Sequence, residues 1–272
     1  FPSIHVGYTL PHEQKLTFAY SYRTNRPELF YMEPYITYRD YYTAEIGNPD
    51  IRPEYIHSYE LNYKKNIGEQ VLQSSLFYRS RKDKIERLRV PYEAGVTLDS
   101  MANVGNDHAL GMELSGQFIV NKWWNLNVNG NVYYYKVVNN INAGGKEETS
   151  TNYDITVNNL LRICKNTRIQ LDGNFVGPSV TTQGRSDSFW FVNLAIRQQW
   201  FGSNLQSTLS FRDIFNSARY KNDITTPNLE SVTHIRPKFP VITLSISYTF
   251  NHFKRSSQNS RDNRDLFEGV NH

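Results

Sequence analysis

Apolar and polar residues alternate with a period of two over most of the chain. In the segment 241–250, Ile242, Leu244 and Ile246 fall on one face, whereas serine and threonine residues fall on the other. Because successive side chains of a β-strand point to opposite faces, this pattern predicts a strand with one apolar and one polar face. The segment 124–135 repeats the pattern and places asparagines opposite its apolar residues. Such a polar face suits a water-filled lumen better than a soluble core.

The pattern predicts about eleven strands along the chain. They lie near 3–10, 15–24, 55–65, 71–82, 107–120, 124–136, 151–164, 168–177, 187–200, 204–215 and 238–250. Short connections (11–14, 66–70, 121–123, 165–167 and 201–203) alternate with long ones (25–54, 83–106, 137–150, 178–186 and 216–237). We therefore predict an all-β fold, an antiparallel transmembrane β-barrel with short periplasmic turns and long extracellular loops.

The charged residues follow the same alternation. When the outward face of each strand is chosen from its apolar residues alone, these charges fall on the opposite face: Lys15, Arg23, Glu60, Lys64, Arg79, Arg81, Glu113, Asp154, Arg162, Arg168, Asp172, Arg197 and Arg212. A cation facing lipid at the midplane costs about 2 to 4 kcal/mol, so selection keeps charge off the outward face. The exceptions lie near strand ends: Lys65, Lys82, Lys136, Asp213 and Lys238. Lysines there can reach the headgroups, whereas Asp213 is too short to do so.

Aromatic residues form two groups along the predicted strands. One group lies beside the short turns: Tyr63, Phe118, Trp123, Trp124, Trp200, Phe201 and Phe250. The other lies beside the long loops: Tyr22, Tyr55, Tyr78, Tyr134, Tyr153, Phe175 and Trp190. Two such belts are typical of the two interfaces of a membrane barrel. An aromatic-rich soluble β core is the alternative, but it does not explain the charge alternation or the loop lengths.

Composition and charge narrow the function classes. The mean hydropathy of -0.60 is compatible with a barrel, which needs apolar residues only at alternate positions. The net charge of +4 comes from interspersed charges and gives no nucleic-acid footprint. The single Cys164 excludes an internal disulfide. The seven histidines show no metal-ligand spacing, no phosphate-binding loop precedes a helix, and no helix is predicted, so we expect neither a metal nor a cofactor.

Strand parity predicts that the chain is part of a longer barrel. A complete bacterial barrel has an even number of strands, whereas about eleven are predicted here and the first begins on the long-loop side. We expect residues 1–250 to form a barrel portion. Residues 251–272 are polar and rich in Arg, Asp, Asn and Ser, which predicts a flexible periplasmic tail.

A set of short motifs supports a family assignment. They are Asn25-Arg26-Pro27, Glu33-Pro34-Tyr35, Gly47-Asn48-Pro49-Asp50, Pro53-Glu54, Glu60 and the final strand ending in Ile246-Ser247-Tyr248-Thr249-Phe250. This arrangement resembles the barrel motif of TonB-dependent receptors, and it is most similar to the Bacteroidetes-type outer-membrane β-barrel family.

The resemblance implies a location in the outer membrane of a Gram-negative cell and a barrel of about 22 strands, of which these form the C-terminal half. It further implies a plug domain of the same full-length chain, TonB acting through that plug, and energy-coupled uptake of a scarce nutrient such as a siderophore, glycan or peptide, without enzymatic activity. Whether a surface lipoprotein caps the barrel stays open.

The Gly47–Glu54 segment has a structural interpretation that needs no ligand. Gly47 and Asn48 tolerate left-handed backbone, Pro49 stiffens a turn, and Pro53 favours extended geometry before the next strand.

The first long loop is the candidate for substrate contact, because aromatic rings and guanidinium groups can bind sugars, peptides or carboxylate-bearing chelates. The candidate residues are Arg26, Tyr31, Tyr35, Tyr38, Arg39 and Tyr41. The alternative is that these tyrosines only pack the loop over the barrel mouth. A second group of residues is predicted to face the lumen and the plug: Arg79, Arg81, Glu113 and Arg197.

Two other functions stay open in the sequence. One is a passive porin or a structural outer-membrane protein without a plug. The other is an outer-membrane hydrolase, in which Asp40, Asp83, Asp107 and His108 supply an Asp/His pair.

Overall fold

A computed structural model describes residues 1–139, 146–238 and 240–250. It contains a sheet of 13 strands, in which one strand pair is parallel and the others are antiparallel, and a second sheet of four. The wall strands are β1 (Ser3–Leu10), β2 (Gln14–Asn25), β5 (Glu54–Ile67), β6 (Gln70–Glu93), β7 (Val96–Asn121), β8 (Trp124–Asn139), β9 (Lys146–Arg162), β10 (Thr167–Val176), β13 (Phe189–Trp200), β14 (Leu205–Arg212) and β17 (Val241–Tyr248). None of the described segments is a helix long and apolar enough to cross a membrane.

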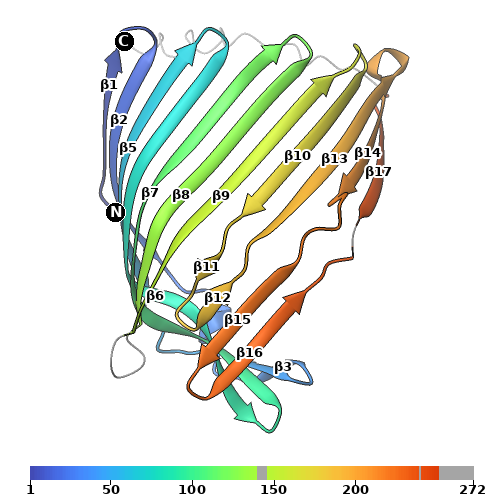
Figure 1. The fold of residues 1–272 in the computed structure, drawn as a ribbon. Coiled ribbons are helices and arrows are strands. Elements are labelled where there is room, and N and C mark those ends of the chain that lie inside the picture. The colour runs from blue at the N-terminus through green and yellow to red at the C-terminus, as the bar shows by residue number, and fades with distance from the viewer. Residues whose placement is uncertain (140–145, 239, 251–272) are drawn as a thin grey trace, which may run out of the picture.

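The wall strands pair in chain order from β1 to β17 and form a single curved, tilted wall (Figure 1). The short turns lie together at the top of this view, and the longer connections project from the lower rim. The predicted strands and the antiparallel topology are therefore confirmed, and the connections predicted to be short join the wall strands at one end. Within the described residues β1 and β17 do not pair, so the wall has two edges whose backbone groups need partners in a membrane.

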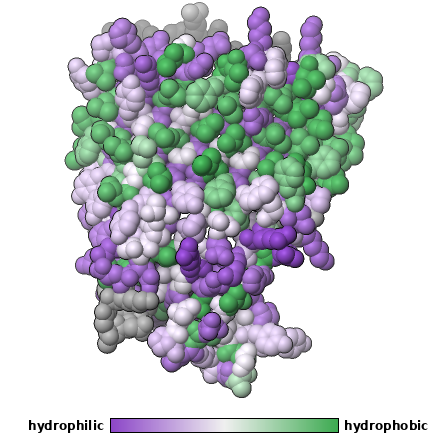
Figure 2. Space-filling model, viewed as in Figure 1, coloured by the Kyte–Doolittle hydropathy of each residue, from purple (hydrophilic) through white to green (hydrophobic). Residues whose placement is uncertain are grey.

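The pairing register assigns each wall residue to one face, because directly opposed residues point the same way. Ile242 opposes Phe211, Phe211 opposes Leu194, and Leu194 opposes Leu171, which places these apolar side chains on one outer face. Followed across all the wall strands, the register places every charge predicted to face inward on the other face. Figure 2 shows the resulting band of apolar side chains across the upper part of the wall, with polar side chains toward the lower rim.

Tyrosine and histidine side chains form stacks on the outer face near the lower rim. Tyr22 stacks on Tyr55 with ring centroids 6.2 Å apart, and Tyr78 lies 6.1 Å from the ring of His108. Beside the short turns, Trp123 stacks on Trp124 at 6.1 Å. The two predicted aromatic groups thus lie at opposite ends of the wall strands.

The long connections differ from the prediction, because most of them are further β-structure. The predicted loop 83–106 is the continuation of β6 and β7 as one long hairpin. The described residues of the predicted loop 137–150 belong to the ends of β8 and β9. The other three connections carry β3 (Thr37–Asp40), β4 (Thr43–Ile46), β11 (Ser179–Val180), β12 (Gly184–Ser186), β15 (Tyr220–Thr226) and β16 (Leu229–Ile235). Two short 3-10 helices, η1 (Leu29–Met32) and η2 (Phe201–Ser203), also depart from the prediction that the chain has no helix. Beyond the apolar band charged residues carry no lipid penalty, so the pattern that identifies wall strands is lost there.

The rim elements pack on one another. β4 pairs in parallel with β7, and β11, β12, β15 and β16 form the second sheet. The turn of that sheet contacts the β6–β7 hairpin, where the Gln183 amide accepts from the Arg89 N–H at 2.8 Å and donates to the Arg89 carbonyl at 3.1 Å. The lower rim is therefore a connected assembly of hairpins.

Candidate functional site

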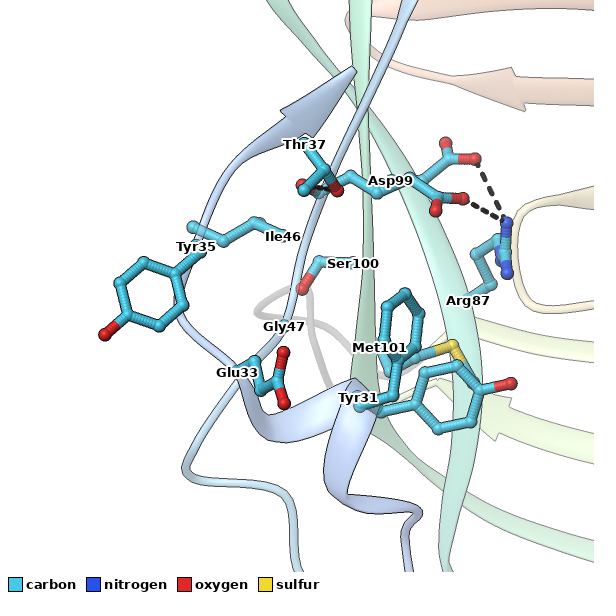
Figure 3. Close-up of a pocket in the computed structure, with 12 residues that line it drawn as sticks. Tyr31, Glu33, Tyr35, Thr37, Ile46, Gly47, Arg87, Asp99, Ser100 and Met101 are labelled. Carbon is cyan, nitrogen blue, oxygen red and sulfur yellow. Dashed lines mark hydrogen bonds and ion pairs between the residues drawn. The ribbon is translucent and has the colours of Figure 1, made fainter. Parts of the chain in front are cut away.

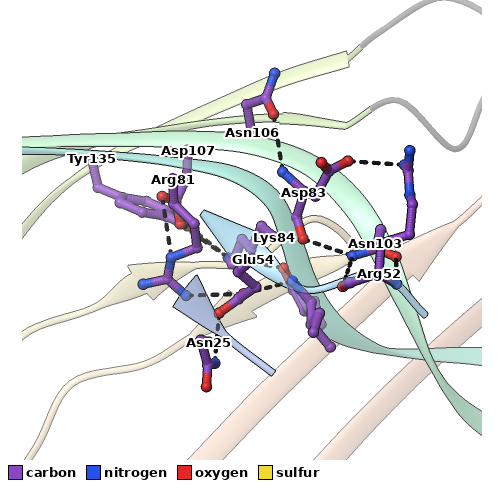
Figure 4. Close-up of polar contacts among 12 residues, drawn as sticks. Asn25, Arg52, Glu54, Arg81, Asp83, Lys84, Asn103, Asn106, Asp107 and Tyr135 are labelled. Atoms are coloured by element: carbon purple, nitrogen blue, oxygen red, sulfur yellow. Dashed lines mark hydrogen bonds and ion pairs between the residues drawn. The ribbon is translucent and has the colours of Figure 1, made fainter. Parts of the chain in front are cut away.

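The carboxylate of Glu54 is the centre of a polar network where the wall meets the rim (Figure 4). Glu54 is only 2% exposed. It accepts hydrogen bonds from the Asn25 side chain at 2.8 Å and from the Ile85 N–H at 2.6 Å, and Arg81 lies 3.4 Å away. A buried charge is tolerated only when it is paired and hydrogen-bonded, and these three partners meet that need. The network joins β2, β5 and the base of the β6–β7 hairpin.

Asp107 is the second buried acid of this network. Its carboxylate accepts a hydrogen bond from the Tyr135 hydroxyl at 2.9 Å and lies 3.7 Å from Arg81 and 3.8 Å from the Lys84 ammonium. Lys84 also donates to the Tyr135 hydroxyl at 2.7 Å. Each charge therefore has an opposite charge nearby, and together they tie β6, β7 and β8 at the inner rim.

A β-bulge turns the wall into the hairpin beside this network. Asp83 adopts a φ of 55°, and the register of β6 against β7 shifts between Arg81 and Lys84. The Asp83 carboxylate pairs with Arg52 at 2.9 Å. The backbone carbonyl of Asp83 accepts a hydrogen bond from the Asn103 side chain at 2.7 Å. Bulges bend a strand and terminate regular pairing, and this one sets the direction of the hairpin.

The family-motif segment holds the first long loop on β7. The Asn48 side chain donates to the Met101 carbonyl at 3.1 Å and accepts from the Asp50 N–H at 3.0 Å. The expectation that Gly47 and Asn48 adopt left-handed backbone is wrong, since neither has a positive φ. Gly47 is required for space instead, because a Cβ at this position lies 2.3 Å from the Glu33 carbonyl oxygen.

Farther along the hairpin, a chain of ion pairs connects the first loop to β6 and β7. Arg89 forms two hydrogen bonds with Asp99, at 2.6 and 2.8 Å, and Asp99 is 2% exposed. The hydrogen bond to Asp99 raises the pKa of the Arg89 guanidinium. Arg87 lies 2.9 Å from Glu45 and 3.6 Å from Asp99, and Arg39 pairs with Glu45 as well. Charged pairs thus fix the β3–β4 hairpin.

A small pocket lies between the first loop and the hairpin (Figure 3). It encloses about 60 Å³. Its walls include Phe30, Tyr31, Ile46, Arg87, Asp99 and Met101. Ligand sites usually enclose about 300 to 1,000 Å³, so this pocket is too small for a nutrient.

The predicted substrate-contact residues divide into two groups. Arg26, Tyr35, Tyr38 and Tyr41 are exposed, and Tyr35 and Tyr41 are 75% and 92% exposed. The Tyr35 ring points away from the pocket (Figure 3). The Tyr38 hydroxyl belongs to β3, and the carboxylate of Glu93 raises its pKa. Tyr31 borders the pocket as Tyr35 does, but it is half-buried, and Arg39 is held by Glu45.

The residues predicted to face the lumen share the inner face. Arg79 lies 3.2 Å from Glu113 and 3.7 Å from Glu60, the last wall residue of the family motif. Arg81 belongs to the rim network. Arg197 lies on β13 beside other cations, with no ion partner among the described residues. These groups can contact a domain or solute enclosed by the wall.

Asp107 and His108 do not form the Asp/His pair that a hydrolase needs. They are adjacent on β7 and therefore point to opposite faces. Asp107 faces inward, whereas the His108 Nδ1 lies 3.0 Å from the Tyr78 hydroxyl on the outer face. Within the described ranges no three His, Cys, Asp or Glu residues are grouped to hold a metal ion.

The sequence analysis missed several rim residues that organise this site. They are Lys84, Arg87, Arg89, Asp99 and Tyr135. One usable signal was present: Arg89 and Asp99 carry opposite charges on either side of Gly95, at positions that a hairpin turning there places together.

The apolar outer face, the charged inner face and the single row of antiparallel strands define the wall of a membrane β-barrel. The chain belongs to the outer membrane protein beta-barrel family, whose model matches residues 1–248. It therefore lies in the outer membrane. No curated protein matches the chain in sequence.

Solved receptor structures share this fold. The siderophore receptor PirA from Pseudomonas aeruginosa superimposes with a TM-score of 0.58 and 14% identity, over 80% of this chain and 39% of that one. For the ferric yersiniabactin uptake receptor FyuA from Yersinia pestis, the TM-score is 0.58 and the identity is 16%, over 90% of this chain and 36% of that one. The copper transporter OprC superimposes with a TM-score of 0.60 and 11% identity, over 90% of this chain and 38% of that one. The chain thus spans less than two-fifths of these structures, and identities this low show the shared fold alone.

Proposed function

We propose that the chain forms part of the barrel of an outer-membrane receptor that takes up a scarce nutrient, with energy supplied through TonB. The observation that carries this proposal is the inner face, where charged side chains such as Arg79, Glu60 and Glu113 line the wall next to a packed rim of hairpins. Such a face suits an enclosed protein domain as well as a solute. The similarity to siderophore receptors and a copper transporter favours uptake over enzymatic activity.

In this proposal residues 1–250 are the C-terminal half of a barrel of about 22 strands. A plug domain of the same full-length chain fills the lumen, contacts Arg79, Arg81, Glu113 and Arg197, and transmits the pull of TonB. Residues 251–272, which lie outside the described residues, form a polar periplasmic tail. A surface lipoprotein is a compatible further partner.

The ligand-contact surface in this proposal consists of Arg26, Tyr35, Tyr38 and Tyr41. Their side chains are exposed on the rim, and aromatic rings and a guanidinium suit siderophores, glycans or peptides.

Uptake by the source cell tests the proposal. Cells with and without the full-length gene receive labelled ferric siderophores, oligosaccharides and peptides, with TonB either active or inactivated. We expect loss of one nutrient's uptake in the deletion strain and equal loss when TonB is inactivated. Uptake that needs the protein but not TonB would instead identify a passive pore.

A further inference from the structure

Three arginines oppose one another directly on the inner face of the wall. Arg162 of β9 is paired in register with Arg168 of β10, and Arg168 with Arg197 of β13. Neighbouring strands lie about 4.8 Å apart, so the three positions fall within about 10 Å. All three side chains are exposed. We refer to Arg162, Arg168 and Arg197 as the arginine row.

In the described wall, no acidic residue occupies the inner-face positions next to the arginine row. Two residues farther along these strands, the inner face carries Leu160, Gln170 and Ala195. On the next strand Arg197 opposes Thr208. Among the residues that the structure describes, no carboxylate pairs with any of the three guanidinium groups.

Two other arginines of the same face are paired with acids. Arg79 lies between Glu60 and Glu113, and Arg81 lies between Glu54 and Asp107. Like charges directly opposite each other destabilise a sheet. An anionic partner from outside these strands would therefore stabilise three unpaired arginines in register.

We propose that the arginine row is a docking site for an acidic protein segment enclosed by the barrel. The inference rests on the proposed function, in which the enclosed segment belongs to the plug domain of the full-length chain. Guanidinium groups bind carboxylates through two parallel hydrogen bonds. An extended segment places same-face side chains about 7 Å apart, so Asp or Glu residues with a spacing of two can meet the row.

Charge argues against the C-terminal tail as the occupant. Residues 251–272 contain four cations (Lys254, Arg255, Arg261 and Arg264) and three acids (Asp262, Asp265 and Glu268), a net charge of +1 from 4 - 3. A tail of this charge does not complement three arginines. The required segment has a net negative charge.

Photo-crosslinking in the full-length protein tests the proposal. A photoreactive amino acid replaces Gln170, which lies on the inner face beside Arg168, and a second variant carries it at Asn129, on the inner face of β8. We expect light to join position 170 to an acidic segment of the same polypeptide, identified by mass spectrometry. Combining R162Q, R168Q and R197Q should lower this yield at least tenfold.

Arg212 supplies the matched control, because it is exposed, lies near the opposite end of the wall and is also unpaired. R212Q should leave the yield at position 170 unchanged, and heat-dependent gel mobility checks that every variant barrel assembles. Three results would overturn this inference alone. The first is crosslinking at position 129 but not at 170, the second is crosslinking of position 170 to a neutral or basic segment, and the third is a yield at 170 that the triple substitution does not change. No capture at either position overturns the enclosed plug, and with it the proposed function.

Discussion

The side-chain amide of Asn25 donates a 2.8 Å hydrogen bond to the carboxylate of Glu54, its directly opposed partner across β2 and β5. The same carboxylate accepts the N–H of Ile85 at 2.6 Å. One buried acid thus joins the last wall positions of two strands to the base of the hairpin that leaves the membrane. Glu54, a residue of the family motif, therefore holds the hairpin on the wall.

Glu54→Ala should loosen the β6–β7 hairpin. The substitution leaves the Ile85 N–H and the Arg81 guanidinium without this acceptor, and an unsatisfied buried polar group costs about 1 to 3 kcal/mol. Amide exchange in the hairpin of the full-length protein should accelerate about tenfold to a hundredfold. Glu113→Ala is the control, because the Glu113 side chain is 45% exposed and its removal should change exchange far less. Equal protection in both variants would contradict this role for Glu54.

Gly47→Ala should displace the first long loop from β7. The added Cβ meets the backbone of Glu33, which cannot rotate away as a side chain does. Overpacking typically costs about 1 to 3 kcal/mol, and limited proteolysis between residues 33 and 46 should become faster. Gly173→Ala provides a matched comparison, since a Cβ there meets nothing within 4 Å and the φ is not positive. An unchanged cleavage rate for Gly47→Ala would show that the loop is not held at this point.

Asp213 breaks the charge alternation for a structural reason. Strand β14 ends one residue earlier, and Asp213 turns away with a φ of 49°. Its fully buried carboxylate accepts hydrogen bonds from the Ser217 N–H at 3.0 Å, the Ala218 N–H at 2.9 Å and the Ser217 hydroxyl at 3.0 Å. The side chain caps a rim turn and does not face lipid.

This geometry predicts acid sensitivity of the turn. Burial by itself raises the pKa of Asp213, but the hydrogen bonds from Ser217 and Ala218 outweigh it and lower the pKa below its usual value. The carboxylate therefore stabilises the turn above the unfolded pKa of about 4, and this stabilisation is lost as the pH falls through the lowered folded pKa. Amide chemical shifts of Ser217 and Ala218 should report that titration.

Asp213→Asn should abolish the titration, whereas Asp50→Asn, in another rim loop, should leave it intact. If the chemical shifts of Ser217 and Ala218 instead change at or above the usual aspartate pKa, the hydrogen bonds to Asp213 do not outweigh the effect of its burial.

Tyr35→Ala and Tyr41→Ala should weaken nutrient binding by the full-length receptor without affecting its assembly. Both rings are largely exposed to solvent. Loss of an aromatic anchor typically costs more than about 1 kcal/mol, which raises Kd severalfold or more. Arg39→Ala is the contrasting variant, because breaking its pair with Glu45 should also accelerate proteolysis of the β3–β4 hairpin. Unchanged affinity in both tyrosine variants would remove this surface from the binding site.

The wall could be predicted from the sequence because lipid imposes a strict rule on it. Each strand must keep charge off one face, so Ile242 to Ile246 and the asparagines of 124–135 reveal both the strand and its outward face. The rim could not be predicted in the same way. Beyond the apolar band, residues such as Arg87, Arg89 and Asp99 satisfy one another within a hairpin, and their pattern resembles that of a polar loop.

The candidate site was predictable only in part for a related reason. The exposed tyrosines of the first loop were identified by residue type, and the structure does expose Tyr35, Tyr38 and Tyr41. Burial of Glu54 and Asp99 depends on segments distant in sequence, which no local pattern reveals. The space required at Gly47 likewise arises from the approach of Glu33, since its own backbone dihedrals do not demand glycine.

Oxygen accessibility along β8 tests the central assignment of faces most directly. Spin labels are placed singly at positions 125–132 of the full-length protein in lipid, with Cys164 replaced by Ser. The account predicts a period of two, with high accessibility to membrane-dissolved oxygen at Leu126, Val128 and Val132 and low accessibility at the intervening asparagines. Uniform accessibility, or maxima at the asparagines, would contradict a lipid-facing outer surface and the barrel wall built on it.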